Sequence, residues 1–216
     1  MLSLPEEILL LLLEDEGGRF VHVPELSMRC VLSGAVLMEL ALADRIDTDP
    51  ERLFVVDAKP IGDELLDPAL RKITASTESR DAGYWVSQCA RMSEDTKRIA
   101  LKRLVDHGIL DQVEDKFLWV FRSRRYPLID GSAEREVKLR IMDILLSDQI
   151  PGPRDVVIVG LVDACGLFKH LLSEREHKRS RDRIRQVRRM DLIGRVVNDA
   201  VREIEASLAM ALHPPF

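Results

Sequence analysis

The first apolar segment of the chain runs from residue 4 to about residue 14, and its hydrophobic positions occupy nearly every side of a helix instead of one stripe. A helix of this kind is stable only when other elements cover it all round. Ser3 and Glu6 form an S-x-x-E capping box at its start, and Pro5 suits the first turn. The pattern therefore predicts a short helix that lies deep in the core.

Later segments place apolar residues at the three- and four-residue spacing of an amphipathic helix. In the first of them, Gly34 and Ala35 would permit close packing against a neighbouring helix. Aromatic residues make up only 5% of the chain, and Leu, Ile, Val and Ala carry the apolar content, so helices are favoured over a β-sandwich or barrel. We therefore predict a mainly α fold. The expected helical segments are 27–43, 63–73, 84–92, 94–107, 133–146, 155–172, 173–189 (a basic helix or a linker) and 192–212.

Short runs of strand-forming residues interrupt this helical pattern. Residues 46–48 and 53–56 flank an Asp-Pro turn and predict a small β-hairpin. Residues 117–121 are five apolar residues that include two Phe and one Trp, a run rich in strand formers and too short for a helix. This run should form a second hairpin, with either 109–110 or 128–129 as its partner strand.

The apolar run of the second hairpin is followed at once by arginines. Exposed aromatic rings beside arginines suit a membrane interface, where the rings lie at headgroup depth and guanidinium groups meet phosphate. A buried strand with a solvated basic end and an oligomer contact along an apolar edge are the alternatives. The apolar group is Phe117, Leu118, Trp119 and Phe121, and the basic group is Arg122, Arg124 and Arg125.

A second concentration of basic residues lies between Lys169 and Arg195, with few acids among them. Such a density of positive charge can bind the phosphates of lipid headgroups or of nucleic acid. A solvated helix face is the plainer interpretation. No aromatic residues are interleaved with the basic ones, which counts against stacking on single-stranded nucleic acid.

The helix expected at 94–107, with the tight turn and basic hairpin that follow it, is also typical of a winged helix. In that interpretation Lys97, Arg98, Lys102 and Arg103 would enter the major groove of DNA. The formal net charge of −5 weakens this alternative, because binding to phosphate would then depend on a local patch.

The residues that most often carry chemistry occur in no recognisable motif. The chain has no H-E-x-x-H or C-x-x-C spacing, no G-x-S-x-G elbow and no phosphate-binding glycine loop. Glu6 and Glu7 are interpreted as acidic residues that favour a helix N-terminus. Asp163, in an apolar segment, is interpreted as a buried, hydrogen-bonded structural residue. We therefore expect no enzymatic activity, no metal ion and no cofactor.

The expected location is the cytoplasm, with peripheral contact at the inner face of the membrane. The start of the chain is acidic where a signal peptide would be basic. The longest apolar run, residues 8–13, is far short of the ~20 residues that span a bilayer. Cys30, Cys89 and Cys165 are an odd and scattered set, which fits a reducing compartment.

Several short motifs follow one another in a fixed order along nearly the whole chain. They are L-S-L-P-E-E-I-L-L-L at 2–11, S-G-A-V-L-M-E-L-A at 33–41, R-I at 45–46, G-D-E-L-L-D at 62–67 and L-V-D-H-G-I-L at 104–110. In this order, and with the hairpin run at its expected distance, they resemble the Golgi phosphoprotein 3 family.

The resemblance implies a central helix bundle surrounded by amphipathic helices, with one or two short β-hairpins, in a single domain over residues 1–216. It also implies no catalysis. Eukaryotic members of the family are peripheral Golgi proteins that bind the headgroup of phosphatidylinositol 4-phosphate and recognise the cytosolic tails of Golgi glycosyltransferases. They use the apolar hairpin for membrane contact and self-association. Their basic N-terminal extension is missing here, so we expect a bacterial member.

The family's lipid pocket maps onto few charged residues in this chain. The pocket tryptophan falls near Pro24, and the three arginines fall on Ser33, Glu94 and Lys97. Only Lys97 keeps its charge, and Arg98 beside it could substitute for a missing arginine. A phosphate needs several convergent donors, so one lysine gives little specificity.

These observations predict a non-enzymatic peripheral membrane adaptor. Its main partner would be an anionic phospholipid surface; a homo-oligomer and protein tails are further candidate partners, and nucleic acid is not favoured. A winged-helix-like DNA-binding protein and a soluble protein-interaction scaffold are the alternatives. The residues expected to meet lipid headgroups are Lys97, Arg98, Arg122, Arg124 and Arg125, and those expected to insert or self-associate are Phe117, Leu118, Trp119 and Phe121.

Overall fold

The structure is a computed structural model in which helices are the main elements. The mainly α class expected from the sequence is confirmed. The description covers residues 1–14, 18–49, 51–117, 121–129, 131–190 and 195–212, with the backbone alone at 114–117, 121–124, 195, 205 and 207–212.

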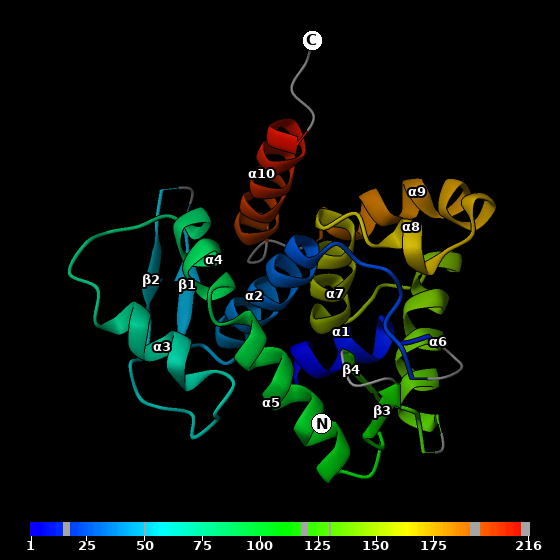
Figure 1. The fold of residues 1–216 in the computed structure, drawn as a ribbon. Coiled ribbons are helices and arrows are strands. Elements are labelled where there is room, and N and C mark those ends of the chain that lie inside the picture. The colour runs from blue at the N-terminus through cyan, green and yellow to red at the C-terminus, as the bar shows by residue number, and fades with distance from the viewer. Residues whose placement is uncertain (15–17, 50, 118–120, 130, 191–194, 213–216) are drawn as a thin grey trace.

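The described helices follow the amphipathic segments expected from the sequence, with two antiparallel hairpins between them (Figure 1). The hairpins pair β1 (Ile46–Thr48) with β2 (Leu53–Val55), and β3 (Val113–Phe117) with β4 (Phe121–Arg125). The helices are α1 (Leu4–Leu11), α2 (Glu25–Leu42), α3 (Asp67–Thr74), α4 (Ala82–Ala90), α5 (Ser93–Asp106), α6 (Ser132–Leu146), α7 (Pro153–Ala164), α8 (Phe168–Leu171), α9 (Glu174–Arg188) and α10 (Arg195–Leu212).

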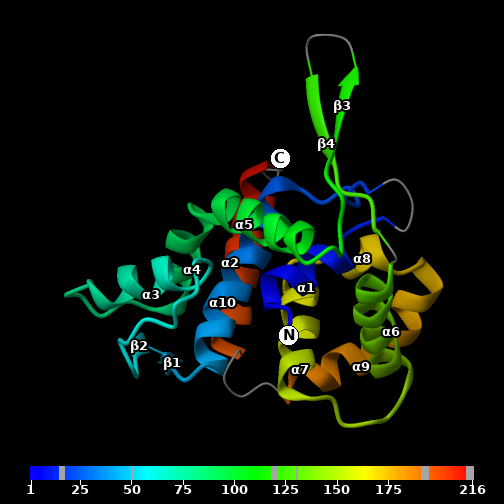
Figure 2. The same cartoon turned by 90° about the horizontal axis from the view of Figure 1, so that it is seen from below.

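Helix α1 lies in the middle of the helical body. It contacts α2, α5, α6 and α7, and Figure 2 shows it enclosed between α5 and α7. All of its residues are buried, and Leu4, Ile8 and Leu9 have no exposed surface. An apolar surface on every side of a helix is stable only when neighbours cover it, so the pattern of this segment dictates its central place. The predicted deep core helix is confirmed.

The predicted capping box at the start of α1 is also present. The amide and the hydroxyl of Ser3 each donate a hydrogen bond of 2.6 Å to Glu6 Oε2. The helix ends at Leu11, earlier than expected, because the chain turns back on itself. Leu13 forms a β-bridge with Phe20, and the amide of Val21 donates to the carbonyl of Leu12 at 2.9 Å.

Two glycines allow α7 to pack closely against its neighbours. A Cβ atom at Gly34 on α2 would lie 2.4 Å from Leu161 Cδ2 on α7. A Cβ atom at Gly160 on α7 would lie 2.4 Å from Asn198 Nδ2 on α10. The close helix packing expected at Gly34 is therefore confirmed, and α10 lies against α2, α4 and α7.

The apolar segment expected as one helix over 155–172 is divided into α7 and α8, so that prediction was wrong in extent. Gly166 has a φ of +63° between the two helices. The amide of Leu167 donates to the carbonyl of Val162 at 2.8 Å, which caps the end of α7. A glycine in the left-handed region is a common helix stop, and here it overrides the apolar periodicity.

The helix expected to open at Asp63 begins instead at Asp67. The segment before it is a turn held by carboxylates: Asp63 Oδ1 accepts a hydrogen bond of 2.7 Å from the amide of Leu65, and Asp67 accepts from the amides of Ile61 and Gly62 at 2.8 and 3.1 Å. Aspartate side chains compete well for nearby amides, and this competition delays the helix.

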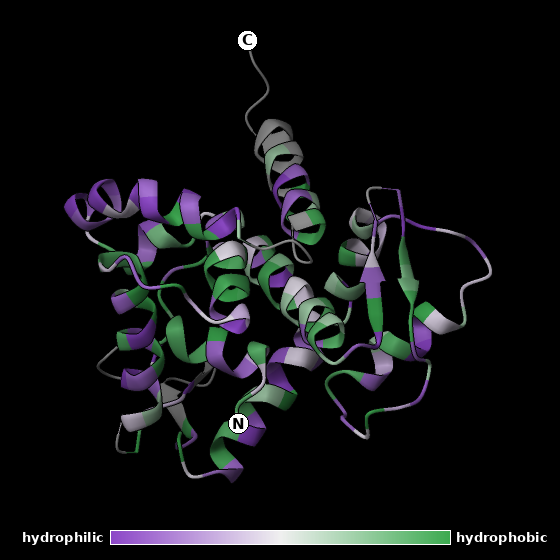
Figure 3. Ribbon diagram, turned by 180° about the vertical axis from the view of Figure 1, so that it is seen from behind, coloured by the Kyte–Doolittle hydropathy of each residue, from purple (hydrophilic) through white to green (hydrophobic). Residues whose placement is uncertain are grey.

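The segment expected as a basic helix or a linker is a helix, α9. Ser173 and Glu176 form its capping box, and Ile184 and Val187 face the core. Arg183 is buried as well, where it donates to the carbonyl of Ile144 at 3.0 Å and so joins α9 to α6. Figure 3 shows α9 as one of the most hydrophilic elements of the molecule. Its outer face carries exposed basic residues noted in the sequence, among them Arg175, Lys178 and Arg179.

Candidate functional site

The β3–β4 hairpin projects beyond the helices that surround it (Figure 2). Its register pairs Val113 with Arg125 at the base and Phe117 with Phe121 at the outer end. Between them, the register places Glu114 opposite Arg124, and Lys116 opposite Arg122, which carries the same charge. Both faces of a projecting two-stranded ribbon meet solvent over most of its length, so its strands tolerate charged residues that a buried strand would exclude.

The strand predicted over 117–121 is corrected by this register. The strands flank the apolar run, so Phe117 ends β3 and Phe121 begins β4. The expected partner strands at 109–110 and 128–129 form only an isolated bridge at the base of the hairpin, between Leu110 and Leu128. Leu118 and Trp119 lie outside the described residues, as do the side chains of Phe117 and Phe121.

The base of the hairpin rests on the segment that follows α1. The amide of Tyr126 donates to the carbonyl of Gly18 at 2.8 Å. A Cβ atom at Gly18 would lie 2.2 Å from the backbone nitrogen of Pro127, so the two backbones touch. The rings of Phe20 and Tyr126 pack at a centroid distance of 6.4 Å. The hairpin is therefore anchored to the N-terminal segment by backbone and aromatic contacts.

The basic residues expected to form one site are only partly brought together. Lys97 is half-buried, and its Nζ lies 4.6 Å from the centroid of the Phe20 ring, which in turn contacts Tyr126. This places Lys97 beside the end of β4, where Arg125 is half-buried. Arg98 instead pairs with Asp95 at 2.9 Å and lines a cavity toward α3. Arg122 and Arg124 are strand positions of β4 whose side chains lie outside the described residues.

Comparison with known proteins adds two findings. A family model described as Golgi phosphoprotein 3 (GPP34) matches residues 4–204. The chain belongs to the Golgi phosphoprotein 3 family. It is also 32% identical over 167 residues to vacuolar protein sorting-associated protein 74 of Eremothecium gossypii, an alignment that covers 67% of this chain and 49% of that protein. The chain thus spans about half the length of this curated relative.

The positions of the Golgi phosphoprotein 3 lipid pocket do not gather positive charge among the described side chains. Ser33 is buried, and its hydroxyl donates to the carbonyl of Val86 at 2.6 Å. Glu94 is an exposed acidic residue in the first turn of α5, and Pro24 precedes α2. Lys97 is thus the one cation among these four positions, and its ammonium group is already placed over an aromatic ring.

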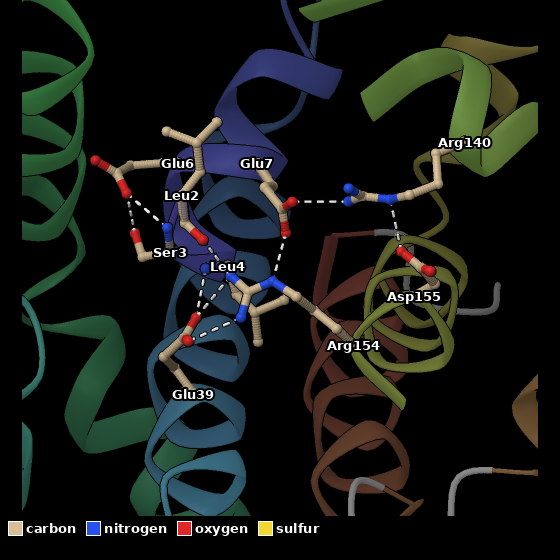
Figure 4. A network of polar contacts seen from close by, with 9 residues as sticks. All are labelled: Leu2, Ser3, Leu4, Glu6, Glu7, Glu39, Arg140, Arg154 and Asp155. Carbon is tan, nitrogen blue, oxygen red and sulfur yellow. Dashed lines mark hydrogen bonds and ion pairs between the residues drawn. The ribbon is translucent and has the colours of Figure 1, made fainter. Parts of the chain in front are cut away.

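The L-S-L-P-E-E segment at residues 2–7 takes part in a network of hydrogen bonds and ion pairs (Figure 4). Glu7 is 3% exposed and accepts hydrogen bonds from Arg140 at 2.7 Å and from Arg154 at 2.8 Å. Arg154 also donates to Glu39 on α2 at 2.9 Å. Arg140 pairs with Asp155 at 2.7 Å. The network therefore joins α1, α2, α6 and α7.

The pKa values of this network follow from burial and from its charges. Burial raises the pKa of Asp155, and the nearby Glu7 raises it further, against the opposing effect of Arg140. For Arg154, burial lowers the pKa, but the carboxylates of Glu39 and Glu7 outweigh this and raise it above the usual range. The arginines are thus fixed as cations between carboxylates. Sequence reasoning took Glu7 as a helix-terminal charge and missed both arginines, since no local spacing links them to it.

Asp163 is hydrogen-bonded, as expected, but it is half-buried and not fully buried. It pairs with Arg188 of α9 at 3.0 Å and with Arg202 of α10. These contacts tie the end of α7 to two helices that follow it. Burial lowers the pKa of Arg188, and the neighbouring Arg202 lowers it further.

Three of the four α5 cations that a winged helix would present to DNA are engaged with neighbouring carboxylates, and Lys97 lies over the Phe20 ring. Arg103 Nη2 lies 2.8 Å from Asp63 Oδ1, and Lys102 pairs with Asp106 on its own helix. Paired cations contribute little positive potential, so this face is a weak electrostatic footprint for a nucleic acid.

The described ranges contain neither a metal-binding cluster nor a membrane-spanning helix. No group of three or more His, Cys, Asp or Glu side chains there could hold a metal ion. Among the same residues, none of the helices combines the length and hydropathy that crossing a bilayer requires.

Proposed function

We propose that this member of the Golgi phosphoprotein 3 family is a non-enzymatic peripheral adaptor that contacts an anionic membrane with its β3–β4 hairpin. The observation that carries the proposal is the projection of this hairpin beyond the helical body (Figure 2). In the sequence, the apolar residues Leu118, Trp119 and Val120 connect its two strands, and β4 carries Arg122 and Arg124. A projecting element with an apolar tip and a basic strand can insert its tip while its arginines meet lipid phosphate.

We assign the headgroup contact to Arg122, Arg124 and Arg125 of β4 and to Lys97 at the base of the hairpin. Lys97 is connected to the end of β4 through Phe20, so it lies on the side from which the hairpin projects. Arg98 faces α3 and pairs with Asp95, so it should contribute less than these residues to headgroup binding. Each basic residue near an anionic surface adds about 1 kcal/mol to binding.

The contact should depend on membrane charge and not on one lipid species. Of the four positions of the family's phosphatidylinositol 4-phosphate pocket, Lys97 alone is basic, and Glu94 would repel a phosphate. Specific phosphate recognition needs several convergent donors. We therefore expect similar binding to vesicles that carry phosphatidylinositol 4-phosphate or phosphatidylglycerol at equal surface charge.

The adaptor role implies a protein partner held at the membrane. The relative from Eremothecium gossypii is named for vacuolar protein sorting, which is consistent with a role in placing other proteins. We propose protein tails at the cytoplasmic face of the inner membrane as the partners. The apolar tip of the hairpin would serve either insertion or contact with a second copy of the chain.

Vesicle cosedimentation tests the membrane contact. The full chain should cosediment with phosphatidylglycerol vesicles in 50 mM salt and dissociate at high salt, because screening weakens the contacts of β4. The double variant Arg122→Ala/Arg124→Ala should lose at least tenfold in binding. Trp119→Ala should weaken binding with less dependence on salt.

The matched control is Arg175→Ala/Arg179→Ala, which removes the same charge from the exposed face of α9 and leaves β4 intact. Equal losses in the two double variants would mean that only overall charge matters, and the hairpin would not be the contact. Duplex DNA binding by the wild type that survives the β4 substitutions and is lost in Lys102→Ala would support the winged-helix alternative instead.

A further inference from the structure

A cavity of about 340 Å³ lies between the end of α1, helix α6 and the short helix α8. Most of its lining is hydrophobic. Glu14 is exposed and marks its opening, while Lys138 and His170 are the other polar groups in the wall. The apolar side chains include Leu13, Ile141, Met142, Leu145, Phe168 and Leu171.

The cavity and the base of the hairpin share one wall. Leu13, Glu14 and Val21 line the cavity, and they belong to the same segment as Gly18, which accepts a hydrogen bond from the amide of Tyr126. The amide of Glu14 also donates to the carbonyl of Arg19 at 2.8 Å, which joins the two described ends of this segment. Figure 2 shows α6 and α8 beside the foot of the hairpin. A membrane that meets the hairpin would therefore lie close to the cavity.

The polar groups of the cavity do not call for a strongly charged ligand. Lys138 donates to the carbonyl of Leu13 at 2.9 Å and pairs with the buried Glu134, so its charge is compensated. His170 has a buried Nε2 atom without a hydrogen-bond partner among the described residues. Burial lowers the pKa of His170, and the nearby Lys169 and His22 lower it further, which favours the neutral form of the imidazole. The cavity thus offers an apolar space and one neutral polar atom.

We propose that this cavity binds a single hydrocarbon chain of a membrane lipid, taken from the bilayer that the hairpin contacts. The proposal rests on the proposed function, since the membrane is the source of the chain. Ligand cavities range from about 300 to 1,000 Å³, so a volume near the lower limit suits one chain and not a whole two-chain lipid. Transfer of an apolar chain into such a space is favourable by about 0.8 kcal/mol for each buried CH₂ group.

Binding of cis-parinaric acid, a fluorescent fatty acid, tests the cavity in the absence of membranes. The full chain should bind it saturably, with one site for each molecule. Met142→Trp fills the cavity from α6 and should weaken binding at least tenfold. Leu139→Trp is the matched control, because Leu139 is on the same helix but is 61% exposed and does not line the cavity. Its affinity should equal that of the wild type.

Leu171→Trp fills the same cavity from α8. It provides an independent test if Met142→Trp does not fold. Unfolding curves establish which variants are folded. Absence of saturable binding by the wild type overturns the proposal, as does equal affinity of a folded cavity-filling variant and of Leu139→Trp.

The vesicle experiment separates this proposal from the membrane function. Loss of cosedimentation in Arg122→Ala/Arg124→Ala with unchanged binding of the fatty acid supports both proposals. If the wild type binds the fatty acid but does not cosediment with vesicles, the bilayer is not the source of the bound chain, and this part of the proposal is overturned. The ligand would then be a soluble apolar molecule. Affinity that falls as the protein concentration rises would mean that a second copy of the chain occupies the cavity, and this too would overturn the proposal.

Discussion

Arg154 on α7 donates a hydrogen bond of 2.8 Å from Nε to Glu7 Oε2 on α1, which ties the central helix to a segment almost 150 positions away. Glu7 is nearly inaccessible to solvent, and Arg140 and Arg154 are its ion-pair partners. Arg154 also holds Glu39 and the carbonyl of Leu2. The loss of one partner from a buried ion pair leaves an uncompensated charge, and this is what makes the network sensitive.

Arg154→Met should therefore lower the free energy of unfolding by about 3 kcal/mol or more. For a chain of this size this corresponds to a fall in Tm of about 6–12 °C. Thermal unfolding followed by circular dichroism measures it. Arg98→Ala, which removes the exposed pair with Asp95, should cost less than about 1 kcal/mol. Equal effects of the two substitutions would contradict the role given to the network.

Gly18→Ala should destabilise the foot of the hairpin. Gly18 has a φ of +63°, and its added Cβ atom would lie 2.2 Å from the backbone of Pro127. Gly108→Ala is the control for backbone strain alone, because its φ is +69° and nothing lies within 4 Å of an added Cβ. Gly108→Ala should lower the free energy of unfolding, measured with urea, by about 1–2 kcal/mol. Gly18→Ala should lower it clearly more. If both variants lose the same stability, the contact with Pro127 does not matter.

Gly34→Ala and Leu161→Ala should show strong coupling between α2 and α7. The added methyl group at Gly34 meets Leu161 Cδ2, and the truncated leucine leaves room for it. Leu161→Ala alone should cost about 2–5 kcal/mol, because the side chain is fully buried. In a double-mutant cycle the combined cost should be smaller than the sum of the single costs by at least about 0.5 kcal/mol. Additive costs would mean that the two sites do not touch.

The pair of Asp63 and Arg103 should make stability depend on pH. Burial acts to raise the pKa of Asp63, but hydrogen bonds from Arg103 and from the amide of Leu65 outweigh it and lower the pKa. Because the pKa of Asp63 is lower in the folded than in the unfolded protein, its carboxylate contributes fully to the free energy of unfolding above the ordinary pKa range of a carboxyl group. This contribution is lost as the pH falls through the pKa of the folded state.

Asp63→Asn should thus lower the free energy of unfolding at pH 7 by about 1–2 kcal/mol, with Arg103 partly exposed to screening. The difference in free energy of unfolding between Asp63→Asn and the wild type should disappear in strongly acidic solution. Glu25→Gln, which removes an exposed pair with Arg29, should change little at either pH. If this stability difference instead widened in acid, the pKa of Asp63 would be raised on folding and not lowered.

The cysteines should be unreactive in the folded protein. Cys30, Cys89 and Cys165 are all buried, and burial raises the pKa of the Cys89 thiol to about 12. Because the thiolate is the reactive form, the native chain should react slowly with a thiol reagent such as Ellman's reagent at pH 8. Denaturant should release three equivalents at once. Fast modification of one equivalent in the native state would show that a cysteine is accessible.

Local patterns determined much of this fold. The all-round apolar segment dictated the buried helix α1, Ser3 and Glu6 dictated its start, and the charge of β4 was visible in Arg122 and Arg124. These features depend on residues within one or two helical turns or on composition, so neighbours in the sequence suffice to predict them. The order of the short motifs was likewise enough to recognise the family.

Tertiary structure alone decided where these elements meet. The pairing of Glu7 with Arg154, the cavity under Leu13 and the contact of Lys97 with the Phe20 ring depend on chain segments that are distant in sequence. The register of the hairpin also departed from the apolar pattern, because a ribbon that projects into solvent has no buried face to fix it. These contacts form only when the helices pack around α1, so the local propensities of the sequence do not predict them.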